Sequence, residues 1–201
     1  MSKTSPSPSG AKASFRPAIE DVVSFAFPYL VVAAIALLRL QNIRPFHLVP
    51  IFASLLLFGA LRPAREFPLP LLLLSAVDML LTTRHYGYAV TVDGFVTWAA
   101  YLAAMFVGAG TLRSLQSVRR VAATSLCVSI AFFLVSNFAV WAAWRMYPNS
   151  FSGLLTCYVA ALPFFRNAVI SELVAAVAFF ALIREAQPVL ARLAPRQVSA
   201  L

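Results

Sequence analysis

Residues 121–144 read VAATSLCVSIAFFLVSNFAVWAAW and contain no Asp, Glu, Lys or Arg. An α-helix rises about 1.5 Å per residue, so about 20 apolar residues cross the roughly 30 Å hydrocarbon core of a bilayer. The whole chain of 201 residues has a matching composition, with 61% hydrophobic and 11% charged residues. Soluble domains are nearer one half apolar and one quarter charged. The sequence therefore predicts an all-α integral membrane protein and excludes a soluble enzyme or a disordered regulator.

Five further apolar runs lie on either side of this segment. They predict spans at about 22–38, 47–61, 67–83, 94–112 and 167–183. Together with the first segment they predict a polytopic helix bundle over residues 18–186. Residues 1–17 form a polar tail that is expected to be disordered, because it has little apolar surface to bury. Residues 187–201 are expected to form a short cytoplasmic tail.

Residues 151–165 are apolar but short, and they lie between Pro148 and Pro163. A helix of this length reaches roughly 22 Å, so it is either a tight seventh span or a re-entrant or interfacial helix. The positive-inside rule separates the two topologies. With six spans and an inside N-terminus, eleven Lys and Arg fall inside and five outside, whereas a seventh span gives nine and seven. The predicted topology is therefore six spans plus a short re-entrant helix, with both termini inside.

The net charge of +9 does not indicate a nucleic-acid partner, because the 16 Lys and Arg are scattered among the loops. The sequence has no HExxH, GxSxG or P-loop motif, and His47 and His85 are far apart. Cys127 and Cys157 each stand alone in an apolar stretch, which indicates neither a disulfide framework nor a metal site. We therefore expect no enzymatic activity, no metal and no cofactor.

Polar side chains within the spans come from three separate segments and lie at similar predicted depth. Asp78 and Glu172 each lie about five residues from the outer end of a span, and Asn137 lies about eight residues from one. A carboxylate deep in lipid costs about 2.5–3.5 kcal/mol unless it is paired, protonated or faces a wet cavity. These residues predict an outward-facing polar pocket for a small solute. The expected binding residues are Asp78, Asn137, Trp141, Glu172, Arg39, Arg166, Asn167 and Tyr158.

These residues also have structural interpretations. Asp78 and Arg39 could form an ion pair that joins two spans. Glu172 could extend toward the interface near Arg166. Asn137 could form a hydrogen bond to a neighbouring helix.

Small residues recur at four-residue spacing in the fourth predicted span. They form two rows, Ala99 with Ala103, and Ala100 with Ala104 and Gly108. This spacing permits close contact between helices, either within the chain or with a partner subunit.

Several short runs carry a resemblance to a known family. In the C-terminal half they are SNFAVW (136–141), MYP (146–148), GL (153–154), CY (157–158) and ALPFFRN (161–167). In the N-terminal half they are Pro50, FGA (58–60), and Ser75 with Asp78. Over about 39–183 the chain resembles an uncharacterised family of small bacterial multi-span membrane proteins that are described as transport proteins. The acidic residue of that family's sixth span is Glu172 in this sequence.

That family is similar in size and span number to the substrate-binding (S) subunits of energy-coupling-factor vitamin transporters. The resemblance implies a multi-pass protein of the bacterial inner membrane that captures a vitamin or cofactor precursor from outside. It also implies docking onto a transmembrane coupling subunit with ATPases, with membrane lipid as a further partner. One alternative is a non-transporting structural or accessory subunit of a larger membrane complex. The other is an intramembrane enzyme that would use Asp78 and Glu172 as acid and base.

Overall fold

The computed structural model describes residues 15–41, 49–87, 89–113, 117–144 and 146–193, and every regular element in these ranges is helical. The α-helices are α2 (Phe15–Leu40), α3 (Ile51–Leu61), α4 (Pro68–Leu80), α5 (Val92–Thr111), α6 (Val118–Trp144) and α7 (Phe151–Leu193). A 3₁₀ turn, η1 (Ala64–Glu66), precedes α4, and a π-helical segment, η2 (Leu81–His85), continues it. The all-α prediction is confirmed.

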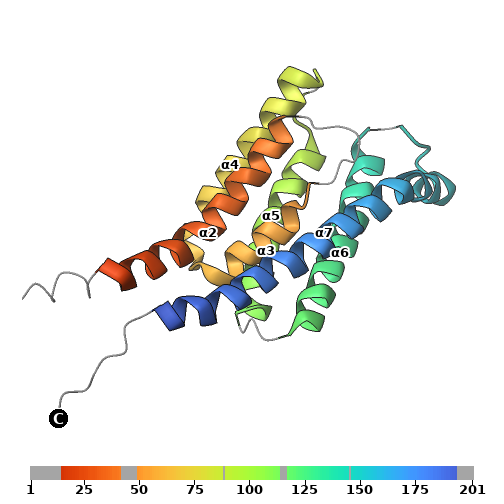
Figure 1. Ribbon diagram of the computed structural model, residues 1–201. Coiled ribbons are helices and arrows are strands. Elements are labelled where there is room, and N and C mark those ends of the chain that lie inside the picture. Colours follow the sequence, from red (N-terminus) through yellow and green to blue (C-terminus); the bar gives the residue numbers. More distant parts are fainter. Residues whose placement is uncertain (1–14, 42–48, 88, 114–116, 145, 194–201) are drawn as a thin grey trace, which may run out of the picture.

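Successive helices run in opposite directions along the bundle (Figure 1). The Phe15 end of α2 and the Leu193 end of α7 consequently lie at the same end of the molecule. The connection from α3 to α4 also lies at this end. The number of helices that cross a membrane, and the side of the membrane that this end faces, stay predictions.

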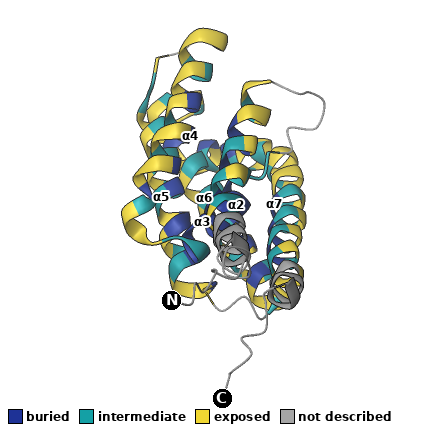
Figure 2. Cartoon of the chain, turned by 60° about the vertical axis from the view of Figure 1, so that its left-hand side comes forward, coloured by how far each residue is buried: buried dark blue, intermediate teal, exposed yellow. Residues whose placement is uncertain are grey.

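Among the described residues, four segments are long and apolar enough to cross a membrane: Ala64–His85, Val92–Thr111, Val118–Trp144 and Phe151–Glu185. Their outward-facing side chains are often large and apolar, such as Leu72 and Val174, which are 68% and 65% exposed. Figure 2 shows exposed residues along the outer sides of the helices and buried residues toward the centre. A surface of this kind is suited to lipid rather than to water, so the structure indicates a membrane protein.

Helix α3 corrects the predicted span at 47–61. The helix begins at Ile51, directly after Pro50, and contains 11 residues, about half the length that a bilayer requires. Every residue from Ile51 to Ala60 is buried. Short apolar runs of this length are typical of helices buried in protein, and composition alone does not separate them from short spans. α3 is therefore a central helix surrounded by the other helices.

Helix α7 corrects the separate re-entrant helix at 151–165. That segment and the predicted span at 167–183 form one continuous helix of 43 residues that passes through Pro163. Proline lacks a backbone N–H and commonly bends a helix, and the first turns of α7 run at an angle to the rest (Figure 1). Helical structure also enters both expected tails, because α2 begins at Phe15 and α7 ends at Leu193.

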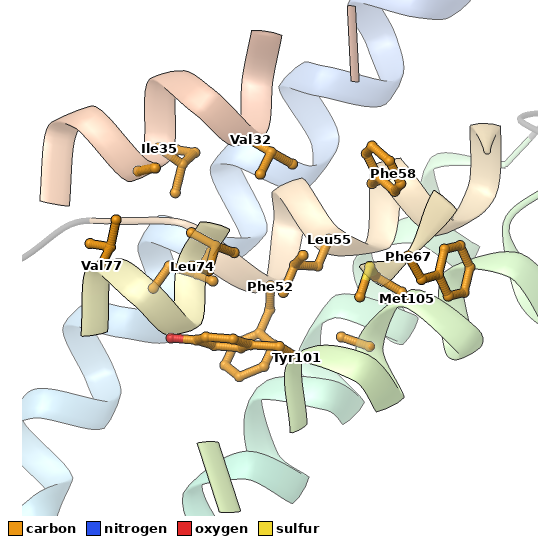
Figure 3. Close-up of a cluster of buried hydrophobic side chains, with 13 residues drawn as sticks. Val32, Ile35, Phe52, Leu55, Phe58, Phe67, Leu74, Val77, Tyr101 and Met105 are labelled. Atoms are coloured by element: carbon orange, nitrogen blue, oxygen red, sulfur yellow. The ribbon is translucent and has the colours of Figure 1, made fainter. Parts of the chain in front are cut away.

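The hydrophobic core is centred on α3 (Figure 3). Its side chains pack against buried residues of α2, α4 and α5, among them Val32, Leu74 and Met105. The rings of Phe52 on α3 and Tyr101 on α5 have centroids 5.9 Å apart. Because α3 is enclosed by the other helices, its position determines where side chains of the surrounding helices can contact one another.

The small residues of α5 divide between two surroundings. Ala104 and Gly108 are buried, and Gly108 faces the backbone of α3. Ala99 and Ala103 are exposed and line an apolar groove of about 380 Å³ next to α6. Packing within the chain therefore accounts for part of the predicted small-residue pattern, and the exposed part remains open to a partner.

Candidate functional site

A pocket of about 470 Å³, here called the main pocket, lies among α2, α3, α5, α6 and α7. Its polar lining residues are Arg39, Thr97, Tyr101, Ser129, Ser136, Asn137 and Glu172. Its aromatic lining residues are Phe52, Phe132, Phe133, Phe164 and Phe165. A volume of several hundred Å³, apolar walls and a few convergent polar groups are typical of small-molecule sites.

The main pocket lies toward the end of the bundle that is opposite Phe15 and Leu193. Arg39 is the penultimate residue of α2, and Thr97 lies in the second turn of α5. These two helix ends are at that end of the bundle in Figure 1. The pocket therefore lies away from the Phe15 end of α2 and the Leu193 end of α7, and its depth in a membrane stays a prediction.

Glu172 of α7 binds the N-terminus of the buried helix α3. Its Oε1 accepts a hydrogen bond from the Phe52 N–H at 3.0 Å, and its Oε2 accepts one from the Ala53 N–H at 2.6 Å. The first N–H groups of a helix have no partner within the helix, and Pro50 at the N-cap provides no side-chain bond. The partial positive charge at this helix end stabilises the carboxylate anion. Glu172 is only 5% exposed, so a residue from α7 supplies the cap that α3 itself lacks.

Asp78 joins three helices at one point. Its Oδ1 lies 2.5 Å from an Nη atom of Arg39 on α2, and its Oδ2 accepts a hydrogen bond from the Tyr101 hydroxyl on α5 at 2.9 Å. Asp78 is 8% exposed, whereas the Arg39 side chain is 30% exposed. The interpretation of Asp78 and Arg39 as an ion pair between two helices is confirmed.

A second pocket of about 280 Å³ adjoins this ion pair. Arg39 and Thr97 line both pockets, and the second pocket also includes Asp78, Asp93 and Trp144. Asp93 accepts a hydrogen bond from the Trp144 Nε1–H at 2.9 Å. Arg39, held by Asp78, therefore forms part of the wall between two polar cavities.

Four of the predicted site residues meet in this region. Arg39, Asn137 and Glu172 line the main pocket, and Asp78 contacts its wall through Arg39 and Tyr101. The Asn137 side-chain N–H donates to the Phe133 carbonyl of its own helix at 2.8 Å, so this bond does not join two helices. Glu172 caps α3 and does not extend to the interface. Polar groups from distant segments thus converge in this region, as expected.

The other four predicted residues lie outside both pockets. Arg166 and Asn167 are exposed on α7. The Trp141 Nε1–H donates to the Pro148 carbonyl at 3.0 Å, and the Tyr158 hydroxyl donates to the Leu134 carbonyl at 2.7 Å. The expectation that these side chains line the pocket was wrong. The continuous helix α7 turns Ala161, Phe165, Ala168 and Glu172 toward the pocket. Arg166 and Asn167 consequently lie on other faces of the same helix.

Several pocket residues were not predicted. On α6, Ser129, Phe132, Phe133 and Ser136 line the pocket together with the predicted Asn137, and these positions recur at three- and four-residue intervals. This spacing places them on one face of a helix, so the sequence contained a signal for them. Phe52 and Tyr101 had no such signal, because their place in the wall depends on the position of α3.

Comparison with known proteins identifies the family. Residues 20–193, which include α3 to α7 and most of α2, match a family described as a family of unknown function, DUF6580, and the chain belongs to it. No curated protein matches the chain. No solved structure matches it. The predicted membership of an uncharacterised family is confirmed at this level.

Proposed function

We propose that this protein is a membrane solute-binding or transport subunit that captures a small polar molecule in the main pocket. The observation that carries the proposal is a cavity of ligand size with polar side chains from α2, α5, α6 and α7. Buried ionic groups rarely add stability compared with well-packed apolar residues of the same volume. Polar and ionisable groups within a membrane protein are costly and usually mark a functional site. A binding function gives a reason for retaining Glu172 and Asn137 at the same cavity.

The finer part of the proposal concerns the transport class. A small all-helical membrane protein with a pocket near the end opposite Phe15 and Leu193 is consistent with a substrate-binding subunit of the energy-coupling-factor type. Such a subunit would take a vitamin or cofactor precursor from the outer face of the bacterial inner membrane. The sequence contains no P-loop motif, so energy for transport would come from a partner with ATPases or from an ion gradient.

The proposal is tested by native mass spectrometry of the full-length protein, extracted in mild detergent. The wild type should retain a small molecule. Ala161→Trp, which places a large side chain at the pocket wall, should abolish retention. The matched control is Ala160→Trp, because Ala160 is exposed on the same helix and does not line the pocket. Equal retention in both variants, or no retained molecule in the wild type, would count against a binding function.

The accessory-subunit alternative is favoured by one observation. The apolar groove between α5 and α6 includes the exposed residues Ala99, Ala103, Ala131 and Val135. An accessory subunit should co-purify with another membrane protein seated there, and Ala103→Phe should release it. The same spectra that test ligand retention report such a partner.

A further inference from the structure

We propose that the ligand of the main pocket is an organic cation with an aromatic or apolar body, held with its positive charge beside Glu172. This inference rests on the proposed binding function and names its ligand class. It follows from three features of the pocket: its charges, its rings and one unpaired hydroxyl.

The first feature is an acidic group that no side chain neutralises. Arg39 and Glu172 both line the main pocket, but Arg39 is already paired with Asp78 at 2.5 Å. Within the described ranges Glu172 forms no ion pair, and its hydrogen bonds come from backbone N–H groups. Glu172, when ionised, is therefore an acidic group of the described lining that no side chain neutralises. A cationic ligand would neutralise it.

The Glu172 carboxylate can also accept further hydrogen bonds. An ionised carboxylate has about four acceptor positions, and the Phe52 and Ala53 N–H groups use two of those on Glu172. Since Glu172 also lines the pocket, free acceptor positions remain for an N–H donor of a ligand. The α3 N-terminus favours the ionised form of this buried carboxylate, and an adjacent cationic ligand would favour it further.

The second feature is the arrangement of aromatic rings. The ring centroids of Phe133 and Phe165 are 4.3 Å apart, and those of Phe52 and Phe132 are 4.7 Å apart. Aromatic faces attract cations through their quadrupole and also bury apolar ligand surface. Rings around a single carboxylate favour a cation over an anion of the same size.

The third feature is an unpaired hydroxyl, which offers a ligand a further polar contact. Ser129 is 6% exposed and lines the main pocket, yet its Oγ has no hydrogen-bond partner in the described part of the chain. Leaving such a group unsatisfied is costly in a folded protein. An ammonium group could donate to this oxygen.

The test uses three aromatic probes of similar size: phenethylamine as the cation, 2-phenylethanol as the neutral compound and phenylacetate as the anion. Binding to the full-length protein in detergent is measured by calorimetry at neutral pH. Phenethylamine should bind about tenfold or more tightly than either other probe. Glu172→Gln should remove this preference, and Glu185→Gln, which changes an exposed carboxylate on the same helix, should keep it.

A second variant protects the test if Glu172→Gln fails to fold after losing part of the α3 cap. Phe133→Leu leaves that cap intact and should weaken phenethylamine more than 2-phenylethanol. Phe151→Leu, at an exposed position of α7, is its control. Equal affinities for the probes, a preference for phenylacetate, or no binding of phenethylamine would overturn the inference. A neutral or anionic molecule retained in native mass spectra would also reject it, while leaving the proposed binding function in place.

Discussion

A methyl group added at Gly108 of α5 would overlap the carbonyl oxygen of Leu56 in α3, so the two helices are in backbone contact at this pair. The relationship is reciprocal, because a Cβ at Gly59 of α3 would overlap the carbonyl oxygen of Met105 in α5. Small residues allow membrane helices to approach in this way. The two glycines thereby fix the position of the helix whose N-terminus binds Glu172.

Replacing Gly108 with alanine should therefore destabilise the protein. Overpacking a close contact costs about 1–3 kcal/mol, since backbone atoms cannot move aside as a flexible side chain can. Thermal unfolding in detergent measures the change. Gly110→Ala is the control, because a Cβ there would meet no atom within 4 Å. A Gly108→Ala protein as stable as the control would contradict the contact.

Removing one partner of the ion pair between Arg39 and Asp78 should be costly. Arg39→Leu leaves the Asp78 carboxylate buried without its counter-ion, and breaking a buried pair typically costs about 3–5 kcal/mol. The double variant Arg39→Leu/Asp78→Leu should lose less free energy of unfolding than the two single variants lose in sum, as unfolding measurements can show.

The exposed pair of Arg184 and Glu185 offers a comparison for this experiment. Their side chains are 49% and 70% exposed, and surface pairs contribute about 0–1 kcal/mol. Arg184→Leu should therefore change stability little. If both arginine variants cost the same, the Arg39 pair is as weak as a surface contact and does not join the helices.

Substitutions of residues that line the main pocket should reduce ligand retention, whereas substitutions of predicted site residues outside the pocket should not. Asn137→Ala should reduce the fraction of protein that carries a small molecule in native mass spectra, because Asn137 lines the main pocket. Asn167→Ala removes the same chemical group from an exposed position and should have no effect, as should Arg166→Ala. Loss of the molecule in the Asn167→Ala variant would place the site on the outer face of α7.

The predicted orientation is tested by labelling single cysteines in intact cells with a membrane-impermeant maleimide. The background carries Cys127→Ala and Cys157→Ala, which removes both native thiols. Tyr86→Cys should react from outside, whereas Arg65→Cys should react only after lysis, because the positive-inside rule places it in the cytoplasm. Both wild-type side chains are exposed in the structure. The opposite labelling pattern would reverse the orientation.

The sequence alone determined the protein class, the all-helical fold and the approximate positions of most helices. These properties depend on composition and on runs of apolar residues, which are local features that any helix long enough for a bilayer must show. The same reasoning found Asp78, Asn137 and Glu172, because polar groups are rare and conspicuous in apolar runs. It also anticipated that they would meet near one end of the bundle.

Only the tertiary structure decided how those groups are used. The burial of α3, the continuity of α7 through Pro163 and the capping of Ala53 by Glu172 depend on contacts between segments that are distant in sequence. A run of eleven apolar residues has the same composition whether it lies in lipid or in a protein core. Its surroundings therefore decide whether it forms part of a membrane span or a buried helix. The exposed positions of Arg166 and Asn167 likewise follow from the helix that carries these residues. Their place near a span end in the sequence did not show which way their side chains face.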